Sequence, residues 1–185
     1  MKREHLVHEL TVMPNAALVH RNRLCNLIIK DLDNLPILLE LTFQVDDKLS
    51  IRAAWILELV CKESLNYIIP HLDFFLDGIK TVKFDSVKRP CAKICELIAL
   101  DYDKGGTIKP FLTTQHKDAL TTCCFDWMIG NEKVAVDAYA MMCLYVFGKE
   151  SDWIHQELMK ILEKDMTHKS CGYKARGVKI LKLIS

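Results

Sequence analysis

Apolar residues recur at helical spacing along most of the chain, and polar residues fill the positions between them. Signals for β-strands are weak, because alternating β-branched runs are short and the hairpin dipeptide Asn-Gly is absent. The pattern therefore predicts an all-α fold. Its first helix is expected over about residues 14–31.

After this first helix, the apolar runs form pairs of helices separated by short polar turns. The four expected pairs span about residues 33–62, 64–101, 111–148 and 150–185. Helix ends are indicated by glycines that follow apolar runs, namely Gly78, Gly130 and Gly148. Helix starts are indicated by side chains that can accept from free backbone N–H groups, namely Asp47, Ser86 and Ser151.

The second helices of these pairs repeat one another. The segment ILELV at residues 56–60 aligns with ICELI at 94–98 and with the end of RGVKILKLI at 176–184. The segment VDAYAMMCLY at 136–145 aligns with the same helix. The interval between the second and third pairs is longer and contains DYDKGGTIKP at 101–110, which we expect to be an inserted loop. A two-helix unit of about 40 residues is the period of an α-solenoid.

The first pair has a proline in its first helix, an acidic turn at Asp46 and Asp47, and Arg52 followed by small residues in its second helix. In these features it resembles a HEAT repeat. The arginine recurs at Arg176, whereas the other two units have Pro90 and Asp137 in its place.

This resemblance to HEAT-like (armadillo-type) helical repeat proteins covers about residues 33 to 185. It implies one domain over residues 1–185, built as a right-handed αα-superhelix whose second helices line a concave surface. It also implies a non-catalytic scaffold or adaptor that binds a protein or peptide on that surface. Five positions on the second helices are expected to be exposed and to contact the partner: Arg89, Lys93, Asp137, Lys179 and Lys182.

Four residues of the first pair are expected to be structural. Arg52 is predicted to reach either Asp46 and Asp47 or the carbonyl groups at the end of a neighbouring helix. Trp55 is expected to fill the space between helix layers.

Composition and charge are those of an ordinary globular domain. The net charge of +1 supplies no long-range field that would attract nucleic acid or an anionic membrane. The longest apolar run, AYAMMCLYVF at 138–147, is too short to span a bilayer, and the charged N-terminus does not resemble a signal peptide. We expect a cytoplasmic protein that is a monomer or a weak dimer and does not bind membranes.

The candidate sites for chemistry are all weak. His5, His8 and Glu9 do not have the order found in zinc proteases. The eight cysteines mostly lie in apolar helical patterns, as buried free thiols do, and the spacing of Cys91 and Cys95 is not repeated as a structural zinc site requires. We therefore expect no catalytic residue, no cofactor and no metal, and a core position for the two cysteines.

Two alternatives remain open. Lysines and arginines on the second and last inner helices, with Trp55, allow a nucleic-acid-binding protein similar to the HEAT-like DNA alkylation-repair glycosylases. Glu132 and Asp137 would interrupt such a basic stripe, which disfavours nucleic acid. A small lyase-type enzyme would also be helical, but the chain lacks the catalytic loop of that class.

Overall fold

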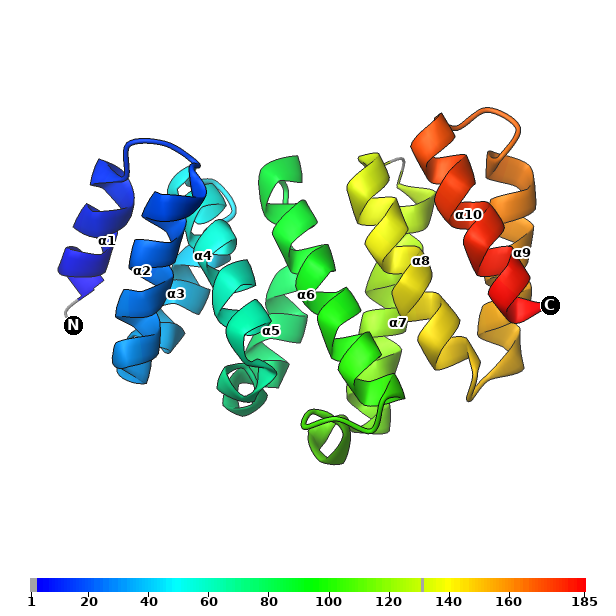
Figure 1. The fold of residues 1–185 in the computed structure, drawn as a ribbon, viewed down its shortest axis with the longest axis horizontal. Helices are drawn as coiled ribbons and strands as arrows, with labels where there is room; N and C mark the ends of the chain where they lie inside the picture. Colours follow the sequence, from blue (N-terminus) through cyan, green and yellow to red (C-terminus); the bar gives the residue numbers. More distant parts are fainter. Residues whose placement is uncertain (1–2, 131) are drawn as a thin grey trace. The chain divides into compact units, whose positions relative to one another are not determined.

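The computed structural model describes residues 3–130 and 132–185, and every regular element in these ranges is a helix (Figure 1). The all-α prediction is therefore confirmed, with neighbouring helices packed as in an α-solenoid. The contacts form two compact units, one up to Ile94 and the other from Cys95 onwards. No helix in the described ranges combines the length and apolar character needed to cross a membrane.

The first unit is built around a central helix, α4. Its α-helices are α1 (Arg3–Val12), α2 (Leu18–Lys30), α3 (Leu35–Thr42), α4 (Leu49–Glu63), α5 (Leu72–Ile79) and the first part of α6 (Asp85–Asp103). Short 3-10 turns occupy η1 (Leu32–Asn34), η2 (Leu65–Tyr67) and η3 (Ile69–His71). Helix α4 packs against α1, α2 and α3. Contact on three sides explains why its sequence is almost continuously apolar.

The small residues of α4 allow this close packing. Ala53 and Ala54 are fully buried, as are Ile56 and Leu57, whereas Trp55 is only half-buried. One charged residue of the helix, Glu58, is also buried, and its carboxylate pairs with the Lys62 ammonium one turn later. A buried charge is tolerated in such a helix only when it has a partner of this kind.

Helix α1 is an element that the sequence pattern did not predict. The expected first helix corresponds to α2, and the chain before it forms a separate helix that ends ahead of Pro14. Only two residues hold α1 to the unit through full burial, Leu6 and Leu10, spaced one turn apart. The remaining positions are largely polar, so the apolar stripe is too narrow to stand out in the sequence.

The second unit is built around α8 in the same way. It contains the rest of α6, the turn η4 (Lys109–Phe111), α7 (Thr114–Ile129), α8 (Val134–Gly148), α9 (Asp152–Asp165) and α10 (Cys171–Ile184). Helix α8 packs against α7, α9 and α10, and most of its side chains are buried. The segment AYAMMCLYVF is thus the core of this unit.

The insertion between the second and third pairs begins later than expected. Helix α6 continues to Asp103, so the loop starts only at Lys104. Gly105 adopts a left-handed backbone conformation with φ of 71°, which favours glycine over other residues. The Asp101 carboxylate accepts a hydrogen bond of 2.8 Å from the backbone N–H of Ile108 and so closes the loop onto the helix end.

The predicted helix boundaries have mixed outcomes. Asp47 accepts from the backbone N–H of Leu49 at 2.8 Å, as a capping residue does. The prediction for Ser86 was wrong, because α6 already begins at Asp85. Ser151 precedes α9, but its side chain forms no capping hydrogen bond.

All eight cysteines are free thiols, and seven of them are buried. Cys91 and Cys95 lie fully buried on α6, in the core position expected for them. Burial raises the pKa of Cys25 to about 11 and also raises the pKa of Cys61. Because the thiolate is the reactive form, these two thiols are poor nucleophiles.

Candidate functional site

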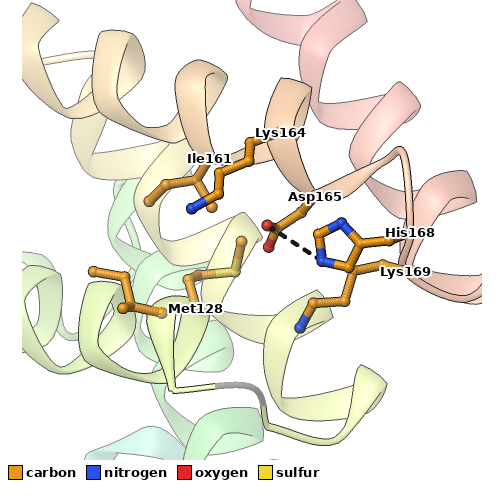
Figure 2. Close-up of a pocket in the computed structure, with 7 residues that line it drawn as sticks. Met128, Ile161, Lys164, Asp165, His168 and Lys169 are labelled. Carbon is orange, nitrogen blue, oxygen red and sulfur yellow. Dashed lines mark ion pairs between the residues drawn. The ribbon is translucent and has the colours of Figure 1, made fainter.

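A pocket of about 380 Å³ lies in the second unit, where the C-terminal ends of α7 and α9 meet the turn between α9 and α10 (Figure 2). It is lined by Met128, Ile129, Ile161, Lys164, Asp165, His168 and Lys169. Apolar side chains from two helix ends thus lie beside four side chains that carry or can carry charge. The four titratable side chains among them are Lys164, Asp165, His168 and Lys169.

Asp165 connects the pocket to α10. Its Oδ2 accepts a hydrogen bond of 3.0 Å from the hydroxyl of Tyr173, and its Oδ1 lies 3.9 Å from a ring nitrogen of His168. Tyr173 is fully buried. Burial, with the Asp165 carboxylate nearby, raises the pKa of the Tyr173 hydroxyl, so the hydroxyl keeps its proton and donates. Asp165 therefore fastens the start of α10 to the end of α9.

A second contact lies behind the pocket, where the Nζ atom of Lys169 is 3.6 Å from Oδ2 of Asp137. Burial raises the pKa of Asp137 to about 6, although the Lys169 ammonium opposes this rise. The same ammonium lies 5.2 Å from the centre of the Tyr173 ring, within the range of a cation–π contact. Lys169 therefore joins the α9–α10 turn to both α8 and α10.

The expectation that Asp137 is exposed was wrong. It lies in the first turn of α8 and is only 1% exposed. The physical reason is that α8 is the central helix of its unit, and the turn that carries Lys169 covers its first turn. Asp137 is therefore a buried structural carboxylate in this conformation, not an accessible contact.

The other four predicted contact residues lie on two helices. Arg89 is exposed and Lys93 is half-buried, one turn apart on the part of α6 that belongs to the first unit. Lys179 and Lys182 are both exposed, one turn apart on α10 in the second unit. Each unit thus carries one pair of these residues on a single helix.

Helix α10 is unusually cationic. It has no acidic residue and four basic ones, Lys174, Arg176, Lys179 and Lys182. Arg176 lies 3.5 Å from the buried carboxylate of Glu96 on α6, an ion pair within the second unit. Lys179 and Lys182 are left pointing to solvent, beside exposed Val178 and Leu183.

Arg52 reaches the carbonyl groups at the end of a neighbouring helix, which was the second of the two predictions for it. Its Nη1 atom donates to the backbone carbonyls of Leu10 and Thr11 at 2.6 and 2.7 Å. These carbonyls end α1, where the partial negative charge of a helix favours a cation. Asp46 instead pairs with Lys83 at 2.9 Å on the surface.

Sequence reasoning missed the residues that join the α9–α10 turn to the rest of the unit. Lys169 and Asp165 lie in or beside a turn, and Tyr173 looks like an ordinary core aromatic residue. One signal was available in the sequence. An acidic residue in the first turn of an otherwise apolar helix must either face solvent or find a cation.

The paired helices and their central apolar members define an all-α repeat protein. A model of the HEAT repeat domain family matches residues 17–184, which is most of the chain. The chain therefore belongs to the HEAT repeat domain family, a family of helical repeat scaffolds that commonly interact with proteins. No curated protein and no solved structure matches the chain.

Proposed function

We propose that this chain is a non-catalytic scaffold or adaptor that binds a protein or peptide partner through exposed positions on its second helices. The observation that carries the proposal is the surface of α10. There, two exposed lysines, Lys179 and Lys182, stand beside two exposed aliphatic residues, Val178 and Leu183. Exposed apolar side chains with adjacent charges are typical of protein interaction sites. Arg89 and Lys93 on α6 are the corresponding candidates in the first unit.

The pocket between α7 and α9 supports a structural role for its charged groups. The Asp165 carboxylate is engaged by Tyr173, and Asp137 is paired with Lys169. Each interaction joins two elements of the unit.

Nucleic-acid binding, including a function like that of the DNA alkylation-repair HEAT proteins, is the alternative that the cations of α10 also favour. Phosphate contacts are strongest at low ionic strength, because salt screens them. Fluorescence anisotropy with a labelled duplex DNA and a single-stranded RNA at low salt therefore tests this alternative. Binding that weakens steeply as salt rises would favour it over the scaffold.

The scaffold function is tested by affinity capture from extracts of native cells after nuclease treatment. Three forms of the chain serve as bait: the wild type, the double variant Lys179→Glu/Lys182→Glu, and a matched control, Lys104→Glu/Lys160→Glu. The control changes the charge equally at exposed positions outside α10. We expect the wild type and the control to enrich the same proteins and the α10 variant to lose them. If no bait enriches a protein, or if capture requires intact nucleic acid, the scaffold proposal fails.

A further inference from the structure

The exposed residues of α10 form one continuous strip along the helix. They are Cys171, Gly172, Ala175, Val178, Lys179, Lys182 and Leu183, here called the α10 face. At 3.6 residues per turn, these positions fall on one side of the helix. We propose that the α10 face binds an acidic, amphipathic peptide segment of a partner protein, an inference that rests on the proposed scaffold function.

The positive charge of α10 favours an acidic partner. The cationic character of α10 is not neutralised from within the helix, because the helix contains no acidic residue. Among the described residues, only Arg176 of the helix forms an ion pair, with Glu96, and it lies beside the α10 face rather than in it. Lys179 and Lys182 therefore present two positive charges one turn apart, which carboxylates at the same spacing would complement.

The aliphatic residues of the α10 face favour a peptide over other anionic partners. Val178 is 44% exposed and Leu183 is 46% exposed, and both flank the two lysines on the α10 face. A phosphate backbone has no apolar group to cover them, whereas an amphipathic helix offers carboxylates and aliphatic side chains together. A second copy of this chain is disfavoured, because a two-fold contact through this face would place lysines against lysines.

The opposite side of α10 holds the helix in place. Tyr173 and Ile180 are fully buried, and the Tyr173 hydroxyl is bonded to Asp165. Gly177 packs closely against α9, where an added Cβ would lie 3.3 Å from Leu162. A face presented by an anchored helix loses little conformational freedom on binding, and this favours affinity.

The inference is tested by selecting peptides from a phage-displayed random library on the full chain. We expect the selected peptides to carry Asp or Glu together with aliphatic residues at helical spacing. A synthetic copy of one such peptide should bind Lys179→Glu/Lys182→Glu at least about tenfold more weakly than the wild type. Val178→Ser/Leu183→Ser should also weaken binding, and the control Lys104→Glu/Lys160→Glu should not. Equal melting temperatures of all variants establish that each is folded.

Three results would overturn the inference: selected peptides without acidic residues, peptides that bind the α10 variant as tightly as the wild type, or no enriched peptide. Duplex DNA and anionic lipid vesicles are titrated in parallel. Tighter binding of either than of the peptide, lost in the α10 variant, would also overturn it. Partner capture through another surface would leave the scaffold function standing, so the two proposals fail separately.

Discussion

The Lys169 ammonium lies 3.6 Å from the carboxylate of Asp137 in the interior of the second unit. The side chains of the two residues are 13% and 1% exposed, and neither oxygen of Asp137 accepts a hydrogen bond from a described residue. A carboxylate in this position has lost its water and gained only one cation at longer than hydrogen-bonding distance. Burial therefore outweighs the ion pair, and this is the reason for the raised pKa of Asp137.

This raised pKa predicts that stability depends on pH in one direction. The pKa of Asp137 is about 6 in the folded protein, against an ordinary value of 3.8. The folded state holds a proton that the unfolded state releases, so this group's contribution is fully present below about pH 4 and is lost as pH rises through about 6. In Asp137→Asn, the decrease in the free energy of unfolding between these pH values should be smaller by on the order of 1–3 kcal/mol. Urea unfolding at several pH values measures it, and an unchanged pH dependence in the variant would contradict it.

Removing the cation should change the pH dependence of stability in the opposite direction from removing the carboxylate. In Lys169→Met, Asp137 is left buried without its partner, so its pKa should rise further and the folded state should lose about 3 kcal/mol at pH 8. The loss should be smaller at acidic pH, where Asp137 is protonated. Lys164→Met is the control, since Lys164 lines the same pocket but is exposed, and its effect should stay within about 0.5 kcal/mol. Equal losses in the two variants would show that the buried pair has no special role.

The contact between Arg52 and the end of α1 predicts a local effect. Arg52→Met removes two hydrogen bonds to the carbonyls of Leu10 and Thr11 and should cost about 1–3 kcal/mol. Because α1 is held by few buried residues, the substitution should speed the exchange of α1 amides with solvent more than that of α4 amides. Hydrogen exchange measures this difference. The control is Asp46→Ala, which breaks only a surface ion pair with Lys83 and should cost under about 1 kcal/mol. Unchanged exchange in α1 would mean that Arg52 does not hold this helix.

The limits of sequence reasoning follow from the same residues. Helices α4 and α8 were predictable, because only a helix covered on several sides can be apolar around its whole circumference. Periodicity shows which face of a helix is polar, but it does not show which turn of the chain will cover that face. Asp137 was wrongly predicted to be exposed for this reason, since the turn that carries Lys169 packs over it. Helix α1 was missed because Leu6 and Leu10 are too few to make a recognisable stripe.

A close approach at Gly148 gives the last prediction. A Cβ atom added at Gly148 would lie 1.9 Å from the His155 ring, far inside contact distance. The ring cannot easily move, because its Nε2 atom lies 2.8 Å from the carbonyl of Tyr145 and the ring stacks on the Tyr145 side chain. Replacing a helical glycine with alanine ordinarily stabilises a helix by about 1 kcal/mol. Here the clash should dominate, and Gly148→Ala should destabilise the chain by about 1–3 kcal/mol.

Thermal and urea unfolding measure this loss, and a second variant identifies its cause. His155→Ala removes the ring that the new methyl group would strike. In the His155→Ala background, Gly148→Ala should therefore cost nothing or should stabilise the helix. If Gly148→Ala were equally harmful in both backgrounds, the cost would come from the backbone at the end of α8 and not from the contact between α8 and α9.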